Sequence, residues 1–476
     1  MACPFPTCPT AGAGSVRVSL ARPLAEQSHT PRAHAAVQED LRRNNLAALV
    51  RNLHLSGPLT RSQLTARTGL NRSTVAGLVG ELASIGLVRE SPSPSGGATG
   101  RPSLVVSLDA ERVWVLAVEL AAEALVVARV GPGGHLHERL AQPRDTRRKL
   151  APADAAATIG ALARQLMNHA PAGAQLVGAA VAIPGIVRRG EGFVHLAPNL
   201  VWRDVPFGAL LSGHLPDRLG VAVANEADLG ALAECARGAA VGHRHVIYVS
   251  GNTGVGAGIV VDGALLAGRS GYAGEVGHMK VNPDGHRCRC GARGCWESEI
   301  GATAMLRRAG RRASDVRAGV SRVLSDAQVG DPKASKAVRE TGQWIGRGAA
   351  NLINIFNPDL VVFGGALRNV YLAAEAVVVR ELQRQVLPQA GAEAAVVAAG
   401  LGADSVLLGA AELALADFLA GPMDSWRREC KAGLRGPAAR RDVSANTQEV
   451  LESELVEPLD VGRPLARRVG VEVLEG

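Results

Sequence analysis

The residues "GEVGHM" (274–279) and "CRCGARGC" (288–295) place one histidine and three of the chain's seven cysteines within eighteen positions. One imidazole and three thiolates are a common ligand set of closed, tetrahedral structural zinc sites. Glycines between the thiols give a loop that is able to fold around an ion. The spacing therefore predicts a zinc site. Its ligands would be His278, Cys288, Cys290 and Cys295.

A redox centre or unrelated thiols are the alternatives to zinc. A redox pair is more often C-x-x-C at the start of a helix, whereas this loop carries C-x-C. The other four cysteines are scattered, and an odd total fits poorly with the disulfide framework of a secreted protein. We therefore favour a metal ion in this loop.

Length and composition indicate a globular protein of several domains. The chain has 476 residues, of which 47% are hydrophobic, enough for two or three separate cores. The sequence contains no run of eighteen apolar residues, and its first thirty residues lack the apolar segment of a secretory signal. We expect a soluble cytoplasmic protein that does not engage a membrane.

An excess of positive charge lies near the N-terminus. The formal charge of the chain is +8, and residues 41–107 hold eight arginines, no lysine and two glutamates, a local balance of +6. Such a concentration suggests a polyanion as the partner of this segment. Charge alone is equally consistent with a solvated basic face.

Residues 37–108 have the pattern of a winged helix-turn-helix domain, behind a leader (1–36) that we expect to be disordered. Apolar residues at helical spacing predict a first helix over 41–55, which Gly57 and Pro58 end. Two shorter helices follow in "TRSQLTART" and "NRSTVAGLVGELASIG". Two strands around "SPSPSGGATGRP" would form the wing.

The ends of the second and third helices carry recognisable signals. Thr60 and Asn71 are the expected N-caps, and Gly69 ends the second helix. In a winged helix-turn-helix the third helix lies in the major groove, so the helix starts and the wing loop would reach base edges and phosphates. A plain packing module is the alternative. The residues that we expect to contact DNA are Thr60, Arg61, Asn71, Arg72, Ser73, Thr74 and Arg101.

Residues 112–418 alternate short Val-, Ala- and Ile-rich strands with Ala-rich helices. "VAVANEADLGALAECARG" reads as a strand that runs directly into a helix, and "HVIYVSGNTGVGAGIVVDGALLAG" predicts a hairpin turned by Asp262 and Gly263. This alternation predicts an α/β domain with ligands at the carboxyl ends of its strands. Residues 419–476 are expected to be a loose tail with one short helix.

The pair "GEVGHM" and "CRCGARGCWE" (288–297) resembles the signature of the ROK family of repressors, open reading frames and sugar kinases. The resemblance covers roughly residues 113–418, and the helix-turn-helix in front is similar to that of the family's repressor branch. It implies an α/β actin-like (ribonuclease-H-like) domain of two lobes, with a sugar bound between them. It also implies that the zinc loop carries residues that hold the sugar.

Position by position, the resemblance implies six sugar-binding residues: Asn199, Asn225, Glu226, Glu275, His278 and Glu297. Carboxylate, amide and imidazole groups form directed hydrogen bonds to ring hydroxyls, and zinc would orient His278 so that its other nitrogen faces the sugar. Taken alone, Asn225 is as well explained as a helix cap, and Glu275 as a surface acid.

The positions that would carry kinase chemistry depart from the family's pattern. Its kinases begin the first lobe with D-x-G-x-T, where this chain has "ELAAE" (119–123). Ala121 adds a side chain where phosphate must approach, and Glu123 replaces a hydroxyl by a carboxylate. Glu226 stands at the general-base position in place of Asp, and moving the oxygen by roughly an ångström costs on the order of a hundredfold in rate. The segments "SGNTGVGAG" (250–258) and "FGGA" (363–366) remain kinase-like.

We therefore expect a sugar-responsive transcriptional regulator, a repressor of carbohydrate-use genes, with no catalytic residue in its degenerate sugar-kinase domain. Its partners would be a double-stranded DNA operator and a small sugar effector, its cofactor zinc, and its assembly a homodimer or a dimer of dimers. The alternative is an active ATP-dependent sugar kinase fused to a DNA-binding domain. A third interpretation is a constitutive DNA-binding protein whose C-terminal domain only dimerises.

Overall fold

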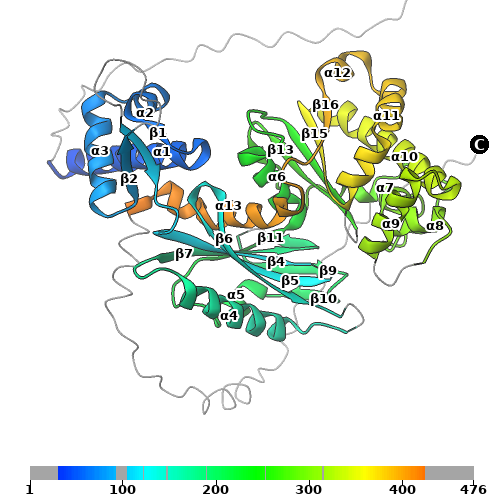
Figure 1. Cartoon of the computed structure of the whole chain (residues 1–476), viewed down its shortest axis with the longest axis horizontal. Helices are drawn as coiled ribbons and strands as arrows, with labels where there is room; N and C mark the ends of the chain where they lie inside the picture. Colours follow the sequence, from blue (N-terminus) through cyan, green and yellow to red (C-terminus); the bar gives the residue numbers. More distant parts are fainter. Residues whose placement is uncertain are drawn as a thin grey trace, which may run out of the picture. The chain divides into compact units, whose positions relative to one another are not determined.

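The computed structural model of the chain describes residues 31–92, 104–121, 123–145, 148–188, 190–251, 254–312 and 316–423. These residues form a small N-terminal helical domain followed by two α/β lobes (Figure 1). Among them, no helix has both the length and the apolar character that crossing a bilayer requires.

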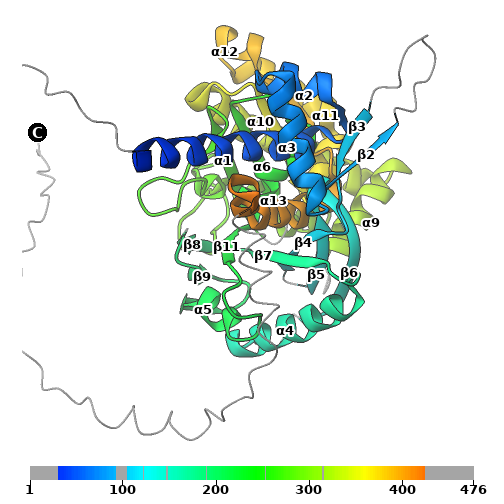
Figure 2. The ribbon, with the colours of Figure 1, turned by 90° about the vertical axis from the view of Figure 1, so that its left-hand side faces the viewer.

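The N-terminal domain combines three helices with a three-stranded antiparallel sheet of order β1-β3-β2. Figure 2 shows the β2–β3 hairpin beside α3. Buried leucines and valines of all three helices share one core with Val106 of the sheet. The elements are α1 (Pro31–Ser56), β1 (Leu59–Thr60), α2 (Arg61–Thr68), α3 (Arg72–Ser84), β2 (Val88–Pro92) and β3 (Leu104–Leu108).

The ends of these helices follow the predicted signals. α1 stops before Gly57, which has a φ of 73°. Thr60 caps α2 through a capping box, and Gly69 ends that helix in the left-handed conformation. Asn71 caps α3 by accepting a hydrogen bond from the Thr74 N–H at 2.8 Å. The predicted caps and stops of the helices are confirmed.

Some predicted features differ from the structure or lie beyond it. α1 begins at Pro31, inside the predicted leader, and residues 1–30 are outside the described part. The strand β1 has no counterpart in the prediction, because a two-residue strand carries no periodicity. The wing loop (93–103), which includes Arg101, and residues 424–476 also lie outside the described residues.

The first lobe is built on a mixed sheet of order β11-β7-β4-β5-β6. Strands β4, β7 and β11 are parallel, in keeping with the predicted alternation, whereas β5 and β6 are antiparallel additions joined by the short helix η1. The strands and η1 are β4 (Val113–Leu120), β5 (Ala124–Gly131), η1 (Pro132–Gly134), β6 (His135–Pro143), β7 (Gln175–Ile183) and β11 (Val221–Asn225).

Alternate residues of β4 face two layers of helices, as the period of two in a strand dictates. Val115 packs in the core that contains α13 (Ser405–Ala420), whereas Leu116 packs in the core that contains α4 (Pro152–His169). Figure 1 shows α4 and α5 (Phe207–Ser212) on one side of this sheet and α13 on the other. A smaller sheet holds β8 (Ile186–Arg188), β9 (Phe193–Ala197) and β10 (Trp202–Val205).

The second lobe is built on a mixed sheet of order β14-β13-β12-β15-β16. The predicted hairpin turn is confirmed, with φ of 53° at Asp262 and 77° at Gly263. The strands are β12 (Val246–Gly251), β13 (Val255–Val261), β14 (Ala264–Leu265), β15 (Leu360–Gly365) and β16 (Ala395–Ala398). The helices are α7 (Trp296–Ile300), α8 (Ala302–Arg308), α9 (Val316–Gln328), α10 (Pro332–Phe356), α11 (Ala366–Gln385) and α12 (Pro388–Glu393).

Two helices, α6 (Glu226–Arg237) and α13, connect the two sheets. α13 packs on β4 and β7 of the first lobe, and α6 packs on β12 and β13 of the second. The helices approach each other closely, because a Cβ added to Gly409 of α13 would lie 1.9 Å from the carbonyl oxygen of Leu229 on α6. Since α6 follows β11 directly, it joins a first-lobe strand to the second-lobe sheet.

Candidate functional site

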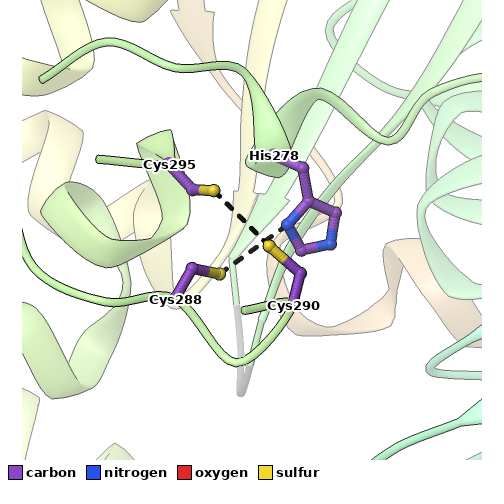
Figure 3. Close-up of side chains that lie close together, drawn as sticks. All are labelled: His278, Cys288, Cys290 and Cys295. Carbon is purple, nitrogen blue, oxygen red and sulfur yellow. Dashed lines mark hydrogen bonds between the residues drawn. The ribbon is translucent and has the colours of Figure 1, made fainter. Parts of the chain in front are cut away.

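The one histidine and three cysteines of the predicted zinc site lie together (Figure 3). Their ligand atoms are all within 4.8 Å of one another. The Sγ of Cys288 is 3.7 Å from Nδ1 of His278, and the Sγ atoms of Cys290 and Cys295 are 3.6 Å apart. Ligand bonds of about 2.3 Å to sulfur and about 2.0 Å to nitrogen give tetrahedron edges of roughly 3.5–3.8 Å. The donor set and these two separations therefore fit zinc.

The loop around this cluster is shaped by a glycine and an anchored tryptophan. Gly294 has a φ of 71°, and a Cβ there would lie only 1.6 Å from the carbonyl oxygen of Asn282. Trp296, directly after Cys295, is fully buried, and its indole N–H donates to the carbonyl of Trp344 on α10 at 2.7 Å. The cluster is therefore fixed to the helical layer of the second lobe.

His278 has its two ring nitrogens on different partners. Nδ1 faces the thiols, and Nε2 lies 3.7 Å from a carboxylate oxygen of Glu275. Glu297 also adjoins the cluster: its Oε2 accepts the Val255 N–H at 3.0 Å, and its Oε1 is 3.9 Å from the Sγ of Cys288. The cluster thus brings three of the six predicted sugar-binding side chains into one place.

Two further predicted sugar residues start α6. The side-chain oxygen of Asn225 accepts the N–H groups of Ala227 and Asp228, and its amide donates to the carbonyl of Gly185 at 2.8 Å. The helix-cap interpretation of Asn225 is thereby confirmed. Glu226 is the next residue, the first of α6. The cap fixes the backbone that carries Glu226.

The structure adds two residues that sequence reasoning missed. Arg289, inside the metal loop, donates a hydrogen bond at 3.1 Å to the side-chain oxygen of Asn199, which ties the sixth predicted sugar residue to that loop. Asp228 is buried in the first turn of α6. Partial removal from water, together with Glu297 and Asp228, raises the pKa of Glu275, while His278 acts in the opposite direction. Glu297 and Asp228 therefore lie close enough to Glu275 for their charges to act on it. The position of Asp228, one helical turn after Asn225, is the sequence signal that could have indicated this residue.

The segment at the kinase phosphate position is also acidic. Glu119 lies near the end of β4, and Ala121 donates its N–H to the carbonyl of Ala124 in the turn that follows. Burial raises the pKa of the Glu119 carboxyl, against the effect of Arg317 and Arg139. Because a raised pKa favours the uncharged form of Glu119, the carboxylate of this segment that opposes a polyphosphate is that of the exposed Glu123.

The residues predicted to contact DNA divide into structural and exposed ones. Thr60 and Asn71 use their side chains as helix caps. Arg61 makes two hydrogen bonds of 2.7 Å to the carboxylate of Glu90 on β2, so its guanidinium links α2 to the wing strand. Arg72 and Ser73 are exposed at the start of α3, and Thr74 is half-buried beside them.

Comparison with known proteins places the two lobes among actin-like sugar-kinase folds. The model of the ROK family matches residues 137–417, and the chain belongs to this family. A xylose repressor of Bacillus spizizenii is 27% identical over 396 residues, which is 81% of this chain and 98% of that protein.

Two further relatives represent a regulator and an enzyme. The crystal structure of a ROK family transcriptional regulator, a homologue of the E. coli MLC protein, superposes with a TM-score of 0.66 at 24% identity over 81% of this chain and 99% of that one. A glucokinase of Streptomyces coelicolor is 34% identical over 217 residues, which is 42% of this chain and 68% of the enzyme.

Proposed function

We propose that this protein is a sugar-responsive transcriptional repressor, in which a winged helix-turn-helix binds operator DNA and a degenerate sugar-kinase domain senses the sugar. The observation that carries the proposal is the length of the similarity to the xylose repressor. That similarity spans 396 residues, far more than the matched family domain alone, and covers almost the whole of the repressor. A similarity of this length supports a counterpart of the helical domain, besides that of the two lobes, in a protein named as a repressor.

The DNA-binding surface is the exposed start of α3 together with the β2–β3 hairpin. A recognition helix presents its N-terminal residues to base edges, and the hairpin then acts as the wing. Asn71 holds the first turn of α3, and Arg61 holds the wing strand through Glu90, so both act by positioning. Arg72 is left as the exposed cation at the helix start.

Replacing Arg72 by alanine is expected to weaken operator binding by about 10- to 100-fold, the range for one specific arginine contact. The duplex would be selected from random sequence by the full chain, and its affinity measured by fluorescence anisotropy. Arg244→Ala removes an arginine that is 69% exposed on the second lobe and serves as the control. Equal affinities of the two variants would refute the assignment of α3 as the recognition helix.

The sensor site consists of the metal cluster and the side chains around it. Zinc would be held by Nδ1 of His278 and the thiolates of Cys288, Cys290 and Cys295, and it would act as a structural ion that fixes the loop. The side chains next to the metal then present hydrogen-bonding groups to sugar hydroxyls: the carboxylates of Glu275 and Glu297, and Nε2 of His278. The other proposed sugar contacts are Asn199, Asn225 and Glu226. A sugar that prefers the form of the protein with weaker DNA affinity releases the operator by linkage.

The runner-up is a working ATP-dependent sugar kinase, and the similarity to a glucokinase favours it. Glu123 of the "ELAAE" segment and Glu226 at the general-base position speak against it, since both disfavour phosphate chemistry. Pairing on two-fold operator half-sites would make the repressor a homodimer or a dimer of dimers.

Calorimetric titration distinguishes the sugar-sensor interpretation from the sugar-kinase interpretation of this protein. The zinc-loaded protein is expected to bind D-xylose or another sugar of a panel of pentoses, hexoses and amino sugars, and to show no heat with MgATP up to millimolar concentration. The same titrations on a ROK glucokinase provide the positive control for nucleotide. Saturable ATP binding by this chain, followed by sugar phosphorylation above background, would move the kinase interpretation to the front.

A further inference from the structure

Helix α6 runs from the sensor site to the DNA-binding domain. Asn225 and Glu226 stand at its N-terminal end, and Arg237 is its last residue. At 1.5 Å per residue, its twelve residues span about 18 Å. One rigid element therefore carries proposed sugar contacts at one end and an arginine at the other.

Arg237 belongs to a buried cluster with His54 of α1 and Glu412 of α13, which we call the joint. The guanidinium Nε donates to Oε1 of Glu412 at 2.7 Å, and Nη1 donates to the backbone carbonyl of His54 at 3.1 Å. The other carboxylate oxygen of Glu412 lies 2.8 Å from Nε2 of His54. Three helices from distant parts of the chain thus meet in one hydrogen-bonded unit.

The imidazole of His54 is completely enclosed and has a defined orientation. Its exposed fraction is 0%, and the N–H of Gly133 donates to its Nδ1 at 3.0 Å. Its Nε2 faces the other two members of the joint, 2.8 Å from Oε2 of Glu412 and 2.5 Å from Nη2 of Arg237. Burial opposes the charge of Glu412, but His54 and Arg237 outweigh it and lower the pKa of that carboxyl. The joint therefore holds its charges paired.

The joint leaves α1 little freedom to move independently of α6. Arg237 packs tightly against the backbone, since a Cβ on Gly134 would lie 2.7 Å from its Cδ. Separating the partners of a buried ion pair exposes uncompensated charge and is strongly unfavourable. On α1, Leu49 and Leu53 are buried in the same core as Leu64 of α2 and Val75 of α3. A shift of α1 is therefore passed on to the recognition helix.

We propose that this joint transmits sugar occupancy from the start of α6 to α1, so that His54, Arg237 and Glu412 set the coupling between sugar and operator without contacting either. This inference rests on the proposed function and names the route by which the same site acts. The three are positioning residues. Their removal should lower the coupling free energy between the two ligands while leaving the affinity for each ligand alone nearly unchanged.

The test uses the full chain with Arg237→Met, which keeps the length of the side chain but removes its fork, and Arg237→Lys, which keeps the charge. Arg311→Met, which breaks the Arg311–Asp326 ion pair of the second lobe, is the matched control. Operator affinity is measured by anisotropy with and without saturating D-xylose or D-glucose, and sugar affinity by calorimetry.

In the wild type, sugar should weaken operator binding by about 5- to 150-fold, the usual range of allosteric coupling. In Arg237→Met the ratio of the operator affinities without and with sugar should fall to within about twofold of unity. Sugar affinity and sugar-free operator affinity should each change by less than about threefold. Arg237→Lys should lie between the two, and adding His54→Gln to Arg237→Met should cause no further loss. Unchanged coupling in Arg237→Met, or an equal loss of coupling in Arg311→Met, overturns the proposal that the joint transmits sugar occupancy.

Hydrogen exchange of residues 45–56 in the sugar-free chain distinguishes failure of the joint from failure of the proposed function. Arg237→Met should raise exchange in this segment at least about tenfold, because α1 loses its buried partner. Unchanged hydrogen exchange of this segment in Arg237→Met overturns the proposed role of the joint, whatever the effect of sugar on operator binding. A wild type that binds sugar without any change in operator affinity refutes the proposed function, and with it the transmission.

Discussion

Replacing Cys290 by serine should remove the metal ion and abolish the response to sugar. Loss of one thiolate breaks a closed four-ligand set, and metal binding is coupled to the folding of the loop that the ligands hold. His278 and Glu297 both contact the cluster, so their orientation is lost with it. Sugar affinity should fall on the order of 100-fold, comparable to the loss of metal affinity or activity when groups that orient a metal site are removed.

The DNA-binding domain provides the internal control for this variant. The helices α1, α2 and α3 pack in one core, and none of them carries a ligand of the metal cluster. Operator affinity without sugar should therefore stay within about twofold of the wild type. Metal content by mass spectrometry should fall from one ion per chain to near zero in Cys290→Ser and stay at one in Cys235→Ala. If Cys290→Ser retained one metal ion per chain and bound sugar unchanged, this would contradict the hypothesis that zinc holds the loop that orients the sugar-binding side chains.

Substituting Gly409 by alanine should strongly destabilise the two lobes. The added Cβ would lie 1.9 Å from the carbonyl oxygen and 2.3 Å from the carbonyl carbon of Leu229, so the backbones of α13 and α6 must separate. Overpacking of a tight core costs about 1–3 kcal/mol, and a clash with backbone lies at the upper end because no side chain can rotate away. The melting temperature should fall by roughly 5–10 °C.

The matched control is Gly80→Ala, which makes the same exchange in α3. A Cβ on Gly80 meets nothing within 4 Å, so the change should be neutral or stabilise that helix by about 0.5–1 kcal/mol. Scanning calorimetry of both variants gives the comparison. Equal melting temperatures for the two would show that α6 and α13 separate without cost, in conflict with their close approach.

Local patterns of the sequence predicted the features that depend on neighbouring residues. The N-caps Thr60 and Asn71, the left-handed Gly69 and the turn at Asp262 all act within a few positions of the signal that indicates them. The metal cluster could be predicted from the sequence for the same reason, because its four ligands lie within eighteen residues. In each case the chemistry of one short segment determines its conformation.

Features that depend on distant residues left no such signal. The DNA contact of Arg61 stays a prediction, but its ion pair with Glu90, twenty-nine residues away on β2, had no signal in the sequence. In the sequence, His54 is only one residue of an amphipathic helix. Its partners Arg237 and Glu412 lie 183 and 358 positions further along the chain. Pairing across such distances is decided by how helices pack, which periodicity does not encode.

The contact between His54 and Glu412 also has a consequence for biosynthesis. A ribosome adds about 5–20 residues per second, so the 358 residues between these two partners take roughly 20–70 s to make. The recognition helix therefore leaves the ribosome and can fold long before the helix that carries Glu412 exists. A nascent or prematurely terminated chain would hold a DNA-binding domain that has not yet been connected to its sensor.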